Sequence, residues 1–198
     1  MDFLNELYNL NSKKITLASR SPRRIGLLKQ IGMTFDIQPA DVDEQPESYQ
    51  NEADYACQNA QSKGDWVWER FPADLVISAD TIVVKDGKIF EKPRDHADAA
   101  HMLKQLSGQT HRVISGFYMR SRDKTILDHE ITDVTFLTLS ESEIQAYLAT
   151  GESFDKAGAY GIQGYGALFV EKVDGCYFNV MGFPLAKFYQ LLKEISPF

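Results

Sequence analysis

Small hydroxyl residues and arginines gather where a predicted strand meets a predicted helix. The apolar run Ile15–Ala18 predicts the strand, and Pro22 suits the first helical turn, where N–H groups have no intrahelical partner. A helix start also presents the positive end of its dipole, and guanidinium groups bind phosphate oxygens well. The residues that could hold a polyphosphate here are Ser19, Ser21, Arg23 and Arg24, with Arg20 as a third guanidinium group. A capped surface helix with solvated arginines is the alternative.

A carboxylate inside an apolar strand is the second chemical feature. Residues 75–84 form a nearly continuous apolar run, which predicts a strand covered on both faces. Asp80 interrupts that run, although Asp is disfavoured in strands and is rarely buried without a partner. Perturbed carboxylates in apolar settings cluster at functional sites. The alternative is structural: Asp80 caps a neighbouring helix or pairs with a lysine.

Other candidates are spread along the chain. Glu44 lies in the acidic loop 41–47, Lys63 lies in a predicted helix, and Lys92 precedes a proline. The glycine-rich segment 157–166 predicts a shaped loop. Singly, these features are equally typical of a solvated loop, surface lysines and a tight corner. Together they offer carboxylates for a divalent metal, cations for phosphates and a backbone that can approach a base closely.

Composition limits the classes of partner. The chain has 198 residues, 43% of them hydrophobic and 25% charged, which is ordinary for a globular protein. A net charge of −7 and a pI of about 5.1 argue against a broad nucleic-acid or membrane-surface footprint and favour one small anion. Cys57 and Cys176 share no metal-like spacing and predict buried thiols of a cytoplasmic protein. Neither a signal peptide nor a segment of transmembrane length is recognisable.

The first half of the chain alternates strands with helices. A helix is expected over residues 49–69, and Asp86-Gly87 predicts a hairpin turn after the strand at 75–84. A further helix has apolar residues between 99 and 106, and Gly108 is placed to end it. This alternation predicts an α/β fold with a mixed sheet.

The second half predicts two long strands, over 113–119 and 126–139. A capping box of Ser140 and Glu143 predicts a helix start, and Gly151 predicts its end. A second hairpin is expected around Asp174-Gly175, with strands at 168–173 and 177–180. Pro184 predicts the start of a last helix.

The order of these motifs resembles the Maf family of nucleoside triphosphate pyrophosphatases. The resemblance covers roughly residues 14–195, which predicts one domain over 1–198 with residues 1–13 as an N-terminal extension. The segments that carry it are Leu17–Arg24, Asp43–Glu44, Lys63, Ser78–Val83, Glu91–Arg94, Leu106–His111, Asp155–Gly164 and Gly182–Leu185.

The resemblance implies a fold like that of inosine triphosphate pyrophosphatases, an elongated mixed sheet flanked by helices with a central cleft. It also implies a homodimer that hydrolyses a nucleoside triphosphate to the monophosphate and pyrophosphate with Mg²⁺ or Mn²⁺. Asp80 matches the general base of the family, and Glu44 with Asp80 would hold the metal. Whether Asp80 acts mainly as base or as ligand stays open. The residues that would neutralise the triphosphate are Arg23, Arg24, Lys63 and Lys92.

Three positions match residues that the family links to substrate choice, namely Arg23, Thr81 and Gln163. In the subgroup similar to 7-methyl-GTP pyrophosphatases, the Thr81 position is typically Gln and the Gln163 position typically Glu. This chain therefore resembles the dTTP/UTP pyrophosphatase subgroup, and the Gln163 amide suits the O4 and N3–H edge of a pyrimidine. Two alternatives remain: a broader activity on modified pyrimidine triphosphates, and a nucleotide-binding regulator of septum formation with little turnover.

Overall fold

The computed structural model describes residues 3–196, which form two compact units. The first unit contains the chain up to Asp80, the segment Ser115–Glu130 and the chain from Gly182 onward. The second unit contains Thr81–Ile114 and Ile131–Met181. The chain passes between the units four times: within the long strands β3 (Leu75–Lys85), β5 (Thr110–Ser121) and β6 (Thr125–Phe136), and once more between Met181 and Gly182.

Within residues 3–196 the strands form a seven-stranded sheet in the order β2-β1-β3-β5-β6-β7, with β4 paired to β3. β1 (Ile15–Leu17) is parallel to both β2 (Asp36–Ile37) and β3. β4 (Lys88–Phe90) is antiparallel to β3, and β7 (Val170–Asp174) is antiparallel to β6. Parallel and antiparallel pairs share one sheet, which confirms the predicted mixed α/β fold.

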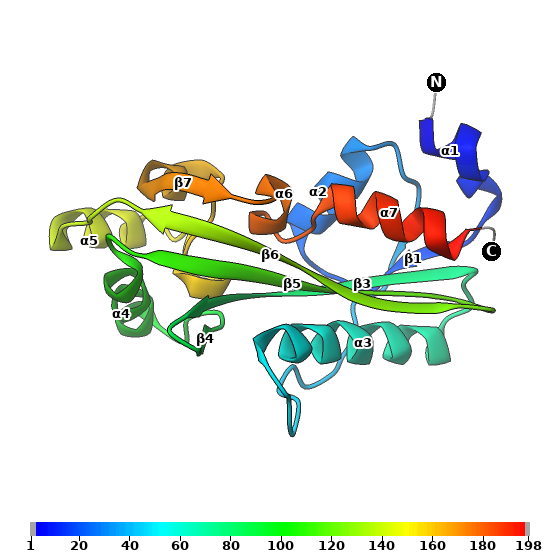
Figure 1. Cartoon of the computed structure of the whole chain (residues 1–198), viewed down its shortest axis with the longest axis horizontal. Helices are drawn as coiled ribbons and strands as arrows, with labels where there is room; N and C mark the ends of the chain where they lie inside the picture. Colours follow the sequence, from blue (N-terminus) through cyan, green and yellow to red (C-terminus); the bar gives the residue numbers. More distant parts are fainter. Residues whose placement is uncertain (1–2, 197–198) are drawn as a thin grey trace. The chain divides into compact units, whose positions relative to one another are not determined.

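In the first unit, helices cover both faces of the strands. α3 (Glu52–Arg70) lies on one face, and α2 (Pro22–Gln30) and α7 (Leu185–Ile195) lie on the other (Figure 1). α3 starts three residues later than predicted because Asn51 caps it by accepting the Asp54 N–H. The chain begins with α1 (Phe3–Tyr8) and the 3₁₀ turn η1 (Leu10–Ser12).

Two glycines bring α3 close to the sheet. A Cβ on Gly116 of β5 would overlap the carbonyl of Ala56 in α3, and one on Gly64 of α3 would overlap the ring of Tyr118. The absence of these side chains lets helix and strand approach more closely than ordinary residues permit. The polar residues of α3 that face the sheet therefore come within hydrogen-bonding reach of β3.

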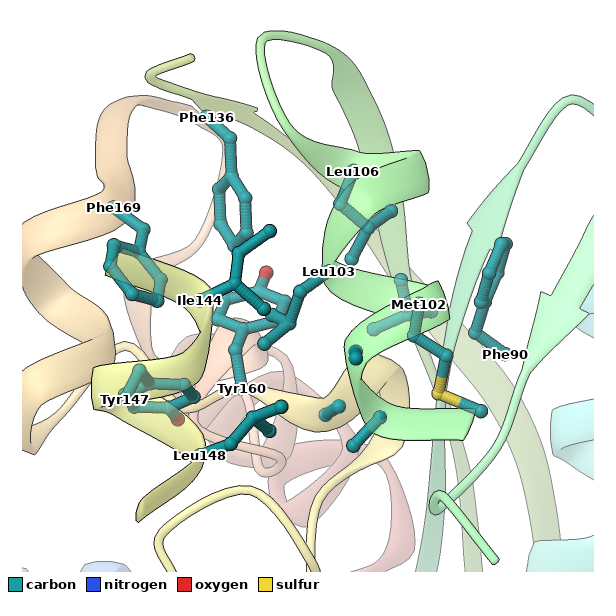
Figure 2. Close-up of a cluster of buried hydrophobic side chains, with 14 of the residues drawn as sticks. Phe90, Met102, Leu103, Leu106, Phe136, Ile144, Tyr147, Leu148, Tyr160 and Phe169 are labelled. Atoms are coloured by element: carbon teal, nitrogen blue, oxygen red, sulfur yellow. The ribbon is translucent and has the colours of Figure 1, made fainter. Parts of the chain in front are cut away.

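In the second unit, α4 (His96–Leu106) and α5 (Glu141–Ala149) build an apolar core with β6 (Figure 2). Phe136 packs edge-on against Tyr160 at a centroid distance of 4.6 Å. The predicted capping box of α5 is confirmed: Ser140 Oγ accepts the Glu143 N–H, and the Glu143 carboxylate accepts the Ser140 N–H. The predicted helix ends are confirmed too, at glycines in the left-handed region after α4 and α5.

The second predicted hairpin is wrong in its second strand. The first strand is confirmed as β7, which starts two residues later than predicted because residues 164–169 form the 3₁₀ segment η3 (Gly164–Phe169). Tyr177–Val180 is the short helix α6 instead of a strand, and β7 pairs with β6. The fully buried Asn179 explains the helix, because its Nδ2 donates to Val113 O and to Thr132 Oγ1, both at 3.0 Å. Long-range hydrogen bonds of this kind override the local turn signal.

Three smaller features also agree with the sequence. The strand at 75–84, the turn at Asp86-Gly87 and the last helix after Pro184 are confirmed. Cys57 is buried as predicted, whereas Cys176 is partly exposed. Within residues 3–196 no helix combines the length and apolar character needed to cross a membrane.

Candidate active site

A lysine joins two carboxylates in the first unit. Lys63 Nζ of α3 lies 2.6 Å from Asp80 Oδ1 on β3 and 2.7 Å from Glu44 Oε2 in the loop after β2. Lys63 and Asp80 are each only 7% exposed, whereas the Glu44 side chain is 49% exposed. The structure thus brings together three residues predicted from sequence. It also shows that Asp80 pairs with a lysine, which was the structural alternative.

Asn59 is a member of this cluster that sequence reasoning missed. Its Nδ2 donates to Asp80 Oδ2 at 3.2 Å, and the residue is 3% exposed. Asn59 lies four residues before Lys63, so both side chains project from the same face of α3. Each oxygen of Asp80 therefore accepts a hydrogen bond from the helix. The i, i+4 spacing of two polar residues was the only sequence signal available.

The charges around Asp80 keep it ionised. Burial raises the pKa of this carboxyl, but the attraction of Lys63 and Arg24 and the hydrogen bonds from Lys63 and Asn59 lower it, and the net pKa lies below the usual value. Asp80 is therefore a carboxylate at neutral pH. An ionised carboxylate in a largely dry position can accept a proton from water or bind a cation.

Arg24 is buried near the same strand. Its Nε donates to Gly182 O at 2.9 Å, and its Nη1 donates to Ala79 O at 2.7 Å and more weakly to Ser19 Oγ at 3.5 Å. Burial lowers the pKa of the guanidinium, and the negative charge of Asp80 opposes that shift. Arg24 thus connects the start of α2 to the residue beside Asp80. Its predicted contact with a substrate phosphate stays a prediction.

The start of α2 has the predicted construction. Ser21 precedes the helix, Pro22 is its first residue, and the Ser21 N–H donates to the buried Ser19 Oγ at 3.2 Å. Arg23 is half-buried in the first helical turn. The start of α2 therefore brings together hydroxyl groups, a guanidinium and the positive end of the helix dipole. These are groups that favour phosphate binding.

The other predicted site residues belong to the second unit. Thr81 follows Asp80 along β3 and is half-buried, whereas Lys92 and Gln163 are exposed. Gln163 directly precedes η3 in the glycine-rich loop. Their roles toward a substrate stay predictions.

The two carboxylates offer a suitable donor set for a hard cation. Glu44 and Asp80 each place an oxygen within 2.7 Å of the same Lys63 nitrogen, so their carboxylates converge. Mg²⁺ commonly uses one or two carboxylates and completes its octahedron with water and substrate phosphates. Among residues 3–196 no cluster of three or more His, Cys, Asp or Glu side chains has a geometry that could hold a metal. Because the Lys63 ammonium lies between the two carboxylates, a metal held by both would have to use oxygen positions that Lys63 leaves open, and a phosphate substrate would complete its ligands.

Comparison with known proteins gives the family. The model of the family described as Maf-like protein matches residues 14–195, and the chain belongs to this family. A Bacillus pumilus protein named dTTP/UTP pyrophosphatase is 45% identical over 187 residues, covering 93% of this chain and 99% of the relative. A Clostridioides difficile protein of the same name is 46% identical over 182 residues, covering 91% and 94%.

Two solved structures are also similar. A HAM1 protein from Coxiella burnetii aligns with a TM-score of 0.49 and 11% identity, covering 91% of this chain and 98% of the other. The Staphylococcus aureus Ham1 protein aligns with a TM-score of 0.46 and 15% identity, covering 78% of each chain.

Proposed function

We propose that this protein is a nucleoside triphosphate pyrophosphatase that hydrolyses dTTP and UTP to the monophosphate and pyrophosphate. The observation that carries the proposal is the buried Asp80–Lys63 pair with Glu44 beside it. The family match and the names of relatives at about 45% identity support the same activity. The substrate class in particular comes from those relatives and from Thr81 and Gln163.

The reaction needs a positioned water and neutralised phosphates. As the water oxygen bonds to phosphorus, the phosphoanhydride bond between the α and β phosphates breaks. Pyrophosphate leaves, and a proton passes from the water to a base. Asp80 is ionised and fixed from two sides, so it can orient the water and accept that proton. The cations proposed to neutralise the phosphates are Arg23, Arg24, Lys63 and Lys92.

Glu44 and Asp80 are proposed to hold Mg²⁺ or Mn²⁺. When bound, such an ion neutralises and orients phosphate oxygens. The Glu44 side chain is half-exposed and could reach an ion, but Lys63 pairs with both carboxylates, so the ion would have to share them with this ammonium or displace it. A direct test compares turnover with Mg²⁺, with Mn²⁺ and with chelator.

Gln163 is proposed to read the base. Its amide can donate to O4 and accept from N3–H of uracil or thymine, whereas a carboxylate at this position could only accept. A site built for two hydrogen bonds rejects bases that leave its polar groups unpaired. We therefore expect higher kcat/KM for dTTP and UTP than for GTP and ATP.

The test is a substrate panel of dTTP, UTP, 5-methyl-UTP, CTP, ATP and GTP, read as pyrophosphate release. Gln163→Glu should reduce the pyrimidine preference, and Gln190→Glu, an exposed change on α7, should not. Equal rates on all triphosphates would contradict the proposed substrate class. Tight binding of dTTP without turnover would favour the regulator of cell division instead.

A further inference from the structure

The loop that carries Gln163 is tied to a carboxylate that neither the sequence nor the family comparison singled out. We propose that Glu152 is a positioning residue that fixes this loop and thereby sets the base preference of the enzyme. The inference rests on the proposed role of Gln163. All residues that carry it belong to the second unit.

Glu152 binds three donors at once. Its Oε2 accepts the Tyr165 N–H at 2.9 Å, and its Oε1 accepts the Gly166 N–H and the Tyr147 hydroxyl, both at 3.2 Å. Hydrogen bonds to an ionised carboxylate are stronger than those between neutral groups. The carboxylate thus anchors the backbone directly after Gln163 to α5.

The backbone around Gln163 is closed so tightly that only glycine fits. Gly164 has a φ of +72°, and a Cβ there would overlap the Glu152 carboxylate. A Cβ on Gly166 would overlap the carbonyl oxygen of Gly161. The two ends of the segment 161–166 therefore touch, and the Glu152 carboxylate occupies the space beside Gly164.

The residues inside this closed segment point in two directions. Ile162 is 7% exposed and anchors the segment in the protein, whereas Gln163 is exposed. A side chain that reads two atoms of a base must be held in place before binding, because ordering it during binding costs affinity. Glu152 supplies that order without contacting the substrate itself.

A change at Glu152 should therefore reduce the preference for dTTP over GTP more than it slows the hydrolysis step. In Glu152→Gln, one carboxylate oxygen becomes an NH₂ group, which cannot accept a backbone N–H. We expect the ratio of kcat/KM for dTTP over GTP to fall at least ~10-fold, mainly through a higher KM for dTTP. Glu152→Asp keeps the charge but is shorter, so its ratio should lie between those of wild type and Glu152→Gln.

The experiment measures kcat and KM for dTTP and GTP in wild type, in Glu152→Gln and Glu152→Asp, and in the control Glu171→Gln. The control removes the same charge from an exposed position on β7 and should keep the wild-type ratio. Gly164→Ala disturbs the same contact from the loop, because the added Cβ would overlap the Glu152 carboxylate. We expect this variant to lower the ratio as well.

Each outcome decides between the two proposals. A wild type that prefers dTTP, with an unchanged ratio in Glu152→Gln, overturns the role of Glu152 and leaves the proposed function intact. An equal loss of kcat/KM on both substrates also overturns it, because that loss indicates general damage to the fold. A wild type without preference overturns the substrate class and the positioning role together.

Discussion

Replacing Lys63 by Met should make the stability of the protein depend on pH in a new way. Met keeps an unbranched apolar side chain of similar length but removes the ammonium that lies 2.6 Å from Asp80 and 2.7 Å from Glu44. Burial raises the pKa of Asp80, and Lys63 is the largest influence that lowers it. Without Lys63, only Arg24 and Asn59 oppose the effect of burial, so the pKa of Asp80 rises.

The size of the effect follows from burial. Removing one partner of a buried ion pair costs about 3–5 kcal/mol, because the other charge is left without compensation. The Glu44 side chain is 49% exposed, so its share is about 1 kcal/mol or less. We expect Lys63→Met to lower the free energy of unfolding at pH 7 by about 3 kcal/mol or more.

The pH dependence of stability differs between the two proteins. In wild type the folded pKa of Asp80 lies below its unfolded value of about 3.9, so its stabilisation is present above that pH and is lost as pH falls. In Lys63→Met the folded pKa is higher than in wild type, so less of this stabilisation is present at neutral pH. The two proteins should therefore differ most at neutral pH, and the difference should shrink as pH falls below about 4 towards the folded pKa of Asp80 in the wild type.

Urea unfolding at pH 7 and at about pH 3, followed by the fluorescence of Trp66 and Trp68 on α3, measures this difference. The control Lys104→Met removes an exposed ion pair with Glu141 and should cost about 1 kcal/mol or less. A loss below about 1 kcal/mol in Lys63→Met at pH 7, or the same loss at both pH values, would refute the reasoning.

Three further changes test other parts of the account. Arg23→Ala should lower kcat/KM for dTTP, and Arg23→Lys should restore only part of it, because lysine cannot form the two parallel hydrogen bonds that arginine makes to a phosphate. Unchanged kinetics in Arg23→Ala would favour the alternative of a surface helix with solvated arginines. Asn59→Leu removes a hydrogen bond to Asp80, so the acidic limb of the kcat/KM profile should move to higher pH with little change in KM, and an unmoved limb would remove Asn59 from the site. Gly116→Ala should cost about 1–3 kcal/mol in urea unfolding, because its Cβ would overlap the backbone of Ala56, and wild-type stability would contradict the close approach of α3.

The sequence predicted most of the features that depend on local signals. The apolar run Ile15–Ala18 predicted β1, and Pro22 predicted the start of α2. The spacing of Ser140 and Glu143 predicted the capping box of α5. These features depend on residues a few positions apart, so periodicity and capping rules apply directly.

The misses come from contacts between distant residues. Asn59 reaches Asp80 across 21 positions, and Asn179 reaches Val113 across 66, so neither partner is visible in a local pattern. The short helix α6 followed from the second of these contacts and overturned the predicted hairpin. Lys63 was predicted as a phosphate ligand from the family resemblance, but only the folded chain shows that it joins two carboxylates.

The most direct test of the central claim is the identity and rate of the products formed from dTTP. ³¹P NMR of the reaction distinguishes dTMP and pyrophosphate from dTDP and phosphate, in wild type and in Asp80→Asn side by side. We predict dTMP and pyrophosphate from the wild type and a rate at least ~10²-fold lower in Asp80→Asn, measured at a temperature at which the variant remains folded. Formation of dTDP and phosphate, or an Asp80→Asn variant that turns over at the wild-type rate, would contradict the account.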